Sequence, residues 1–233
     1  MSIKLYELCS ADPAHLFSPH CWKTRMSLAH KGLDFETVAT PFTGIAGVEG
    51  GPARRVPVLR DGETVIEESL EIAKYLDANY PDAPSLLKGE GGAALTELVI
   101  TWSQTQVHPA VVKLCLMDIF NALAPEDQVF FRATREKAFG KTLEEFQAQF
   151  DQNDNSGLVA SLLPVELMLK KQPFIGGDTP LFADYVVFGA LQWLRTSAPR
   201  DVMPKDSAVA GWFERLLDMY DGAGRRVPAA YAA

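Results

Sequence analysis

The 233-residue chain is short of basic residues and of cysteine, and it lacks a long apolar run. Lys and Arg number 22 against 30 Asp and Glu, and the net charge of −8 argues against a general binder of polyanions, which needs a basic face. A few local Arg or Lys residues still suffice for a small anionic ligand. Because of the negative net charge we expect no nucleic-acid partner. No stretch approaches about 18 uninterrupted apolar residues, so we expect neither a membrane span nor a membrane partner.

The three cysteines, Cys9, Cys21 and Cys115, are widely spaced and odd in number. They indicate neither a disulfide framework nor a zinc site, and they suit a reducing cytoplasm. The residues after Met1 do not form a basic region followed by an apolar run, so we expect no secretion signal. These features together predict a cytoplasmic protein without a metal centre.

Up to Tyr80, short apolar runs alternate with helical patterns. The pattern predicts a strand at Ile3–Leu8, a helix at Pro19–Lys31 ended by Gly32, a strand at 34–40, a β-hairpin within 56–68 and a helix capped by Ser69. A crossover joins the first two strands, so these should run parallel. The hairpin, joined through Asp61-Gly62, must be antiparallel.

Beyond Tyr80 a segment rich in Pro and Gly precedes a purely helical pattern, and we interpret it as a linker. Helices are expected at 94–123 with an interruption at Pro109, at 126–139, at 143–150, at 158–171 with a kink at Pro164, and along an apolar stripe from Val209 to Tyr220. The pattern therefore divides the chain into a first domain at 1–84, a linker at 85–92 and an all-helical domain at 93–233.

Three motifs follow one another in an order that resembles the cytosolic glutathione S-transferase superfamily. They are SPHCW at 18–22, RVPVL at 55–59 followed by Glu68-Ser69, and PFIGGDTPLFADYVVFGAL at 173–191. The resemblance implies an α+β fold in which a thioredoxin-like βαβ-ββα domain precedes an all-α domain. It also implies a homodimer with a role in detoxification, with glutathione as co-substrate and a small hydrophobic electrophile as the other partner.

Four stretches are most similar to the branch that contains bacterial glutathione-dependent β-aryl etherases and related fungal transferases. They are SPHCWKTRMSLAHKGLDF at 18–35, PFTGI at 41–45, KTLEEF at 141–146 and FIGGDTP at 174–180. The helical signature departs from the family at Leu181, where Ser, Thr or Asn usually caps the helix three residues before Asp184. We therefore expect Thr179 or Asp178, with Pro180 at the first helical position, to cap this helix.

The resemblance also places bound glutathione, the one cofactor expected, against Arg55, Val56, Pro57, Glu68 and Ser69, with Arg54 as the alternative to Arg55 at the glycyl carboxylate. Either arginine could instead be a solvated loop charge. Val56 would pair its backbone with the cysteinyl part of glutathione beside a cis bond to Pro57, unless the proline is an ordinary trans residue at a strand start. Ser69 at a helix N-terminus would bind the γ-glutamyl carboxylate and Glu68 its ammonium, unless the pair is only a cap and a solvated acid.

Ser18 is the candidate catalytic residue. A free thiol like that of glutathione has a pKa of about 8.5, and lowering this pKa by about two units requires roughly 2.7 kcal/mol. A donated hydroxyl hydrogen bond supplies roughly 1.5–3 kcal/mol and a helix N-terminus roughly 0.3–1 kcal/mol, and both act at Ser18. The alternative is that Ser18 and Pro19 form an ordinary helix start, in which the Ser18 hydroxyl only caps the backbone. We expect that the hydroxyl must leave the backbone if it is to reach a ligand as well. His20 is expected in solvent and Cys21 in the core.

The helical half should supply the wall for the electrophile. The candidates, chosen by their expected proximity to Ser18, are Phe17, His108, Met117 and Phe120, whereas Trp102 and Trp193 are expected in the core. The predicted function is a glutathione transferase whose bound thiolate attacks an apolar, aromatic electrophile, with cleavage of β-aryl ethers as the specific reaction. The alternatives are an omega-type glutathione-dependent thiol–disulfide oxidoreductase, which would need Cys9 or Cys21 as nucleophile, and a non-enzymatic carrier of hydrophobic ligands.

Overall fold

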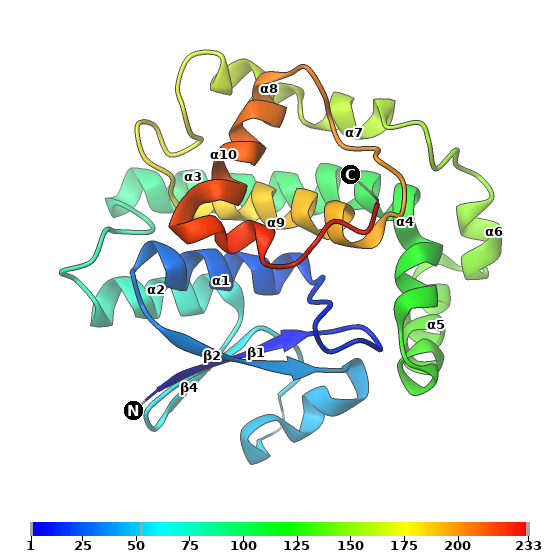
Figure 1. Cartoon of the computed structure of the whole chain (residues 1–233), viewed down its shortest axis with the longest axis horizontal. Coiled ribbons are helices and arrows are strands. Elements are labelled where there is room, and N and C mark those ends of the chain that lie inside the picture. The colour runs from blue at the N-terminus through cyan, green and yellow to red at the C-terminus, as the bar shows by residue number, and fades with distance from the viewer. Residues whose placement is uncertain (1, 52, 232–233) are drawn as a thin grey trace.

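The computed structural model of the protein describes residues 2–51 and 53–231 and shows a sheet-containing half followed by a helical half (Figure 1). The first half consists of β1 (Ile3–Leu8), α1 (Pro19–His30), β2 (Phe35–Thr40), the 3₁₀ segment η1 (Phe42–Gly50), β3 (Val58–Asp61), β4 (Thr64–Glu67) and α2 (Ser69–Asn79). This order confirms the predicted fold class, and β1 has the predicted bounds.

The four strands form one sheet in the order β2-β1-β3-β4. β1 pairs in parallel with β2 and antiparallel with β3, and β3 and β4 form the predicted hairpin. Asp61 pairs with Thr64 and is the last residue of the ladder, so it does not enter the turn. The two-residue loop consists of Gly62, which has a φ of +61°, and Glu63. α1 and α2 lie between the sheet and the helical half (Figure 1).

The helical half consists of α3 (Gly89–Trp102), α4 (His108–Ala122), α5 (Pro125–Phe139), α6 (Leu143–Gln147), α7 (Ser156–Ser161), α8 (Leu163–Leu169), α9 (Phe182–Ser197) and α10 (Ala208–Gly222). A π-helical segment, Ser103–Val107, joins α3 to α4, and Pro109 lies in the first turn of α4, where its missing N–H is not needed. Pro164 likewise begins α8 instead of kinking a longer helix. α3 begins at Gly89, so part of the segment predicted as a linker, 85–92, is helical. Within the described ranges, no helix has the length and apolar character needed to cross a membrane.

α9 is the central helix of the fold, and it packs along α1 (Figure 1). Its residues are all buried except Trp193, which is half-buried. Gly189 lies where α9 meets the start of α1, and a Cβ at this position would lie 2.3 Å from the carbonyl oxygen of Pro19. Glycine is therefore required for α9 to hold the first turn of α1 this closely.

Asp184, a fully buried residue in the first turn of α9, fixes the start of this helix. Its carboxylate accepts hydrogen bonds from the backbone N–H groups of Ile175 (2.7 Å), Gly176 (2.9 Å) and Leu181 (2.9 Å) and from the indole N–H of Trp212 (2.9 Å). Leu181 is the N-cap, so the prediction that Thr179 or Asp178 caps α9 is wrong. The Asp184 carboxylate instead binds the N–H group of the N-cap residue and those of the loop before it, and so fixes the chain that enters the helix.

Gly189→Ala should destabilise the protein by about 3 kcal/mol, because the added methyl group would push the backbone of Pro19 away from α9. Gly211, inside α10, is the matched control, since a Cβ there meets nothing within 4 Å. Gly211→Ala should stabilise the protein by about 0.5–1 kcal/mol. Equilibrium unfolding in urea measures both effects, and two equally small changes would contradict the close packing of α1 on α9.

Candidate active site

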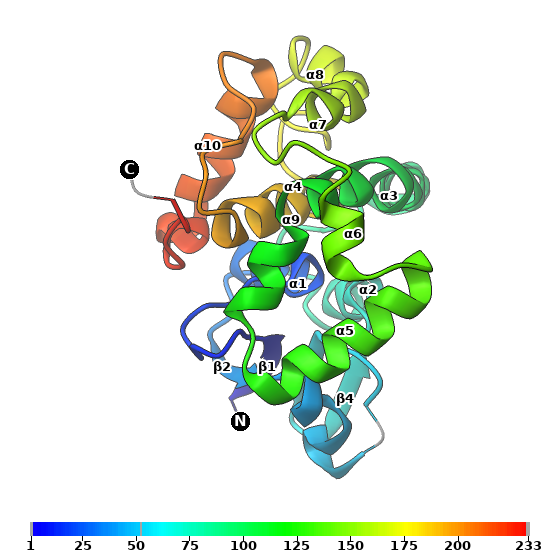
Figure 2. The same cartoon turned by 90° about the vertical axis from the view of Figure 1, so that its right-hand side faces the viewer.

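A cavity of about 340 Å³ lies between the sheet-containing half and the helical half. Its lining comes from the start of α1, from η1, from the loop before β3, and from α4, α5 and α9. Figure 2 shows α4 and α5 beside this junction, with α5 running over η1. A larger hollow of about 600 Å³ opens between α4 and residues 149–161, but none of the predicted site residues lines it.

Ser18 is the N-cap of α1 and lines this cavity together with Pro19. Its backbone is extended (φ −63°, ψ 125°), and its hydroxyl oxygen accepts a long hydrogen bond, 3.4 Å, from the N–H of Cys21. A hydroxyl has two lone pairs and one proton, so accepting this bond leaves the proton for another acceptor. Ser18 can therefore cap α1 and still have a proton to donate to a ligand, so its hydroxyl need not leave the backbone.

Cys21 is packed inside the fold, as predicted, with 1% of its surface exposed. Its sulfur accepts a hydrogen bond from the N–H of Leu8 at 3.5 Å, and burial raises the pKa of its thiol to about 12. Burial also raises the pKa of Cys9. The thiolate is the reactive form of cysteine, so neither residue is suited to act as a nucleophile at neutral pH. No group of three His, Cys, Asp or Glu side chains among residues 2–51 and 53–231 could hold a metal ion.

The peptide bond between Val56 and Pro57 is cis, as predicted. Val56 lines the cavity, while Pro57 is buried and lies outside the lining. Arg54 and Arg55 come just before them, and both are exposed and line the cavity. Within the described part of the chain neither guanidinium is ion-paired with a carboxylate, so both are available to an anion.

Glu68 and Ser69 lie at the start of α2 and do not line the cavity. Glu68, at φ +76°, is the N-cap and Ser69 the first helical residue, so the prediction that Ser69 caps α2 is wrong. The Glu68 carboxylate accepts hydrogen bonds from the N–H of Leu70 (3.1 Å) and from the hydroxyl of Ser69 (3.3 Å). A glutathione carboxylate bound at this helix N-terminus would take the place of the Glu68 carboxylate as acceptor of these hydrogen bonds.

Lys23 is a buried lysine on α1, with 2% of its surface exposed and its Nζ 3.1 Å from Nδ1 of His20. Burial lowers the pKa of Lys23 to about 8, and the nearby Glu68 carboxylate acts in the opposite direction. Burial, followed by the charge of Lys23, lowers the pKa of His20 well below its usual value. His20 therefore lines the cavity as a neutral imidazole, and its prediction as a solvated residue is wrong.

Rings from α1, α4 and α9 form a row along one wall of the cavity. His20 packs edge-on against His108 with ring centroids 5.4 Å apart, and His108 packs in the same way against Trp193 at 5.7 Å. Burial lowers the pKa of His108 to about 4, so this imidazole is neutral at pH 7. Trp193 and Trp102 both pack against the core, but Trp193 also lines the cavity, which was not predicted, whereas Trp102 lies outside the lining.

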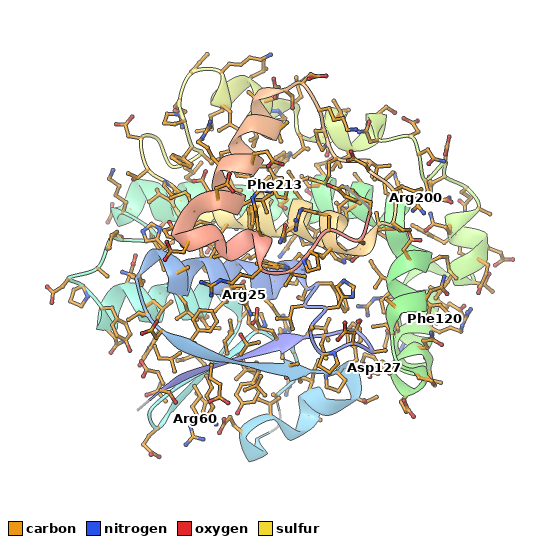
Figure 3. The ribbon with its side chains drawn as sticks, in the orientation of Figure 1. Arg25, Arg60, Phe120, Asp127, Arg200 and Phe213 are labelled. Carbon is orange, nitrogen blue, oxygen red and sulfur yellow. The ribbon has the colours of Figure 1, made fainter. Side chains whose placement is uncertain are left out.

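Phe17 and His108 line the cavity, as predicted, but Met117 and Phe120 do not. On α4 the second lining residue is Ile119, which lies about three helical turns beyond His108 on the same face. Met117 falls on the opposite face of the helix. Phe120 is turned toward α5 (Figure 3), where its ring packs against a phenylalanine of that helix. Their expected proximity to Ser18 made both residues candidates, and the phase of the helix removes them from the lining.

Phenylalanines that were not among the predicted site residues form a second wall, which we call the phenylalanine wall. Phe42 begins η1, while Phe130 and Phe131 lie on α5, and the ring of Phe42 is 5.6 Å and 6.0 Å from theirs. All of them line the cavity. The only sequence signals for this wall are the PFTGI motif and the aromatic pair at 130–131, and neither shows that the two segments meet.

Asp127 joins η1 to α5 across the junction of the two halves (Figure 3). Its carboxylate accepts hydrogen bonds from the backbone N–H groups of Phe42 (2.9 Å) and Thr43 (2.8 Å), and the residue is 1% exposed. These N–H groups lie at the start of η1, where they lack partners within the helix, so α5 supplies the cap for this segment. These two hydrogen bonds therefore hold η1, and with it Phe42, in place relative to α5.

Comparison with known proteins assigns both halves of the chain. The model described as glutathione S-transferase, N-terminal domain, matches residues 14–84, and the model described as glutathione S-transferase, C-terminal domain, matches residues 94–220. The glutathione S-transferase-like protein ustS of Aspergillus flavus is 30% identical over 207 residues, which cover 76% of this chain and 74% of that protein.

Two solved structures of fungal enzymes are similar over nearly the whole chain. Glutathione transferase GSTFuA3 from Phanerochaete chrysosporium is 28% identical, with a TM-score of 0.76 over 96% of this chain and 93% of the other. The glutathione S-transferase CsGST63524 of Ceriporiopsis subvermispora, solved in complex with glutathione, is 25% identical, with a TM-score of 0.79 over 96% of this chain and 98% of the other.

Asp127→Ala should loosen η1, because it leaves the N–H groups of Phe42 and Thr43 without their acceptor. Hydrogen bonds to a charged group contribute roughly 1.5–3 kcal/mol, so exchange of these two amides should accelerate by about tenfold or more. Glu126→Ala, at the neighbouring acid of α5, is the control and should leave both amides unchanged. Hydrogen exchange measures the difference, and equal protection in the two variants would show that Asp127 does not hold η1.

Lys23→Met should change how stability depends on pH. The pKa of Lys23 is about 8 in the folded protein against the ordinary 10.5, so between these values the unfolded chain binds more protons and wild-type stability rises with pH through this group. Across this range the wild type should gain up to about 3 kcal/mol relative to Lys23→Met. Urea unfolding from about pH 7.5 to pH 10 measures the gain. If the difference in unfolding free energy between wild type and Lys23→Met did not change with pH, the titration of a buried lysine would be contradicted. Such a constant difference is expected for Lys137→Met, the control at an exposed lysine.

Proposed function

The chain belongs to the glutathione S-transferase family, and on this basis we propose that it conjugates glutathione to an apolar, aromatic electrophile. We also propose that it belongs to the branch of β-aryl etherases and related fungal transferases. Two fungal transferases that resemble it over nearly their whole length support this assignment. The protein would act in the cytoplasm as a homodimer, each chain having a glutathione-binding domain at 1–84 and, after a linker that ends before Gly89, a helical domain that begins with α3.

The position of Ser18 is the observation that carries the proposal. Ser18 caps α1, lines the cavity and has a hydroxyl proton that a ligand could accept. A sulfur at this point would accept a hydrogen bond from the hydroxyl and would lie at the positive end of a helix. Both interactions favour the thiolate over the thiol, and together they are large enough to lower its pKa by about two units.

Glutathione would lie along the sheet-side wall of the cavity. In this placement its cysteinyl backbone pairs with Val56, and its glycyl carboxylate meets Arg54 or Arg55, which line the cavity beside Val56. Its γ-glutamyl end extends toward the start of α2, where Ser69 would bind the carboxylate and Glu68 the ammonium group. The cis bond that follows Val56 supports this placement, since it is the backbone feature that the family resemblance implies.

The electrophile would lie between the row of His20, His108 and Trp193 and the phenylalanine wall of η1 and α5. With a β-aryl ether, the thiolate sulfur attacks the carbon that bears the aryloxy group. A C–S bond forms as the C–O bond breaks, and the phenolate leaves with the electron pair and takes a proton from water. The aromatic walls suit an aryl substrate because ring–ring contacts stabilise it on both sides.

The geometry disfavours a thiol–disulfide oxidoreductase. That reaction needs a protein cysteine as nucleophile, and the thiol of Cys21 is buried with its pKa raised to about 12. A carrier of hydrophobic ligands would use the same cavity without turnover, and the kinetic experiment below distinguishes it.

Ser18→Ala should lower kcat for conjugation of 1-chloro-2,4-dinitrobenzene by about 10- to 150-fold, because the bound thiolate loses its hydroxyl donor. The pKa of the bound glutathione thiol should rise by about one to two units, and the KM for glutathione should change little. Steady-state kinetics and the ultraviolet absorbance of the thiolate as a function of pH measure these quantities.

Cys21→Ser is the control and should leave conjugation nearly unchanged, since the thiol is buried. Unchanged turnover in Ser18→Ala together with a loss in Cys21→Ser would favour the oxidoreductase. Retention on immobilised glutathione without turnover of any electrophile would favour the carrier.

A further inference from the structure

The cavity beside Ser18 has an excess of positive charge. Arg54, Arg55 and Arg135 line it, and no Asp or Glu among the described residues does so. The chain as a whole has 30 acidic residues against 22 basic ones, so the lining reverses the charge balance of the protein. Walls of one sign favour a ligand of the opposite charge over a neutral ligand of the same shape.

Arg135 of α5 is held over the phenylalanine wall. Its guanidinium carbon lies 4.8 Å from the ring centroid of Phe131 and 5.8 Å from that of Phe42. Stacking on aromatic faces orients an arginine and limits the freedom that it would lose on binding a ligand. One nitrogen donates a hydrogen bond to the hydroxyl of Thr134 at 3.0 Å.

Arg135 differs from its neighbour Arg132 on the same helix. Arg132 is paired with Glu136 at 2.7 Å and with Glu144 at 2.7 Å. In the part of the chain that the structure describes, Arg135 has no such carboxylate, although it is half-buried and burial lowers its pKa. An arginine remains charged at neutral pH even when it is half-buried. Arg135 therefore lines the cavity as a cation that has no carboxylate partner among the described residues.

We infer that Arg135 binds an anionic substituent of the aromatic electrophile, so that the substrates of this protein are aryl compounds that carry a carboxylate or a similar acidic group. The inference rests on the transferase function proposed above. A ring packed against Phe42 and Phe131 would bring such a substituent to the guanidinium, whose planar fork can bind both oxygens of a carboxylate.

The three arginines come from different halves of the fold. Arg54 and Arg55 adjoin Val56, on the side proposed for glutathione, while Arg135 comes from the helical half and lies over the wall proposed for the electrophile. Arg54 or Arg55 can therefore bind the glycyl carboxylate of glutathione, and Arg135 is not needed for this contact. The positive charge on the helical side is left for the second substrate.

The experiment compares the neutral 1-chloro-2,4-dinitrobenzene with the acidic 4-chloro-3,5-dinitrobenzoate. In both, the glutathione thiolate attacks the ring carbon that bears chlorine, the C–S bond forms, the C–Cl bond breaks and chloride leaves with the electron pair. Arg135→Gln should lower kcat/KM for the benzoate by about 10- to 100-fold and for the neutral chloride by less than about threefold. Arg135→Lys, which keeps the charge but not the fork, should restore part of the loss.

Lys137→Gln is the matched control, because Lys137 is exposed on the same helix, lies outside the lining and carries the same charge. It should change neither rate. Equal losses on the two chlorides in Arg135→Gln, or a loss in Lys137→Gln as large as that in Arg135→Gln, would overturn the inference. A rise confined to the KM for glutathione would also overturn it, since Arg135 would then bind the tripeptide.

Binding without turnover separates this inference from the proposed function. Isothermal titration calorimetry with 3,5-dinitrobenzoate, which lacks a leaving group, is made in the presence of S-methylglutathione. The wild type should bind this probe at least about tenfold more tightly than Arg135→Gln. If that difference held while neither chloride turned over, the transferase proposal would fail and the Arg135 site would stand. Turnover of both chlorides with equal probe affinities would uphold the transferase and overturn the inference.

Discussion

Gly189 brings the backbone of α9 against the backbone of α1, and the position of the whole site follows from this contact. Because no side chain separates the helices there, α9 holds the first turn of α1, and with it Ser18, at the junction of the two halves. The buried carboxylate of Asp184 fixes where α9 begins. A helix N-terminus with a hydroxyl is thereby placed in the wall of a cavity instead of in open solvent, where its effect on a charge would be weaker.

The charged groups around the cavity divide into those that hold the structure and those that are available to ligands. Asp127 caps η1 and Glu68 caps α2, so the acids near the site are engaged by backbone N–H groups. Burial keeps the imidazoles of His20 and His108 neutral at pH 7. The charges that remain in the lining are those of arginines, set among aromatic rings. This combination suits a thiolate nucleophile on one side and an aryl substrate with an acidic group on the other.

The parts of this arrangement that have a local sequence signal could be predicted from the sequence. The strand and helix that flank Ser18 follow from apolar periodicity and from Pro and Gly at the helix ends, and the cis bond after Val56 follows from a family motif. The walls could not be predicted in the same way. Trp193 lies in a continuous apolar helix whose periodicity does not show which residue meets a cavity. Phe42 and Arg135 come together only because α5 packs on η1, a contact between distant segments that no local pattern encodes.

The decisive measurement is a structure of the protein with glutathione bound. We expect the cysteinyl sulfur within hydrogen-bonding distance of the Ser18 hydroxyl oxygen, with the cysteinyl backbone paired to Val56 and the γ-glutamyl end at the start of α2. A sulfur that points away from Ser18, or a tripeptide bound elsewhere than beside Val56 and α2, would contradict the assignment of α1 as the thiolate-stabilising helix.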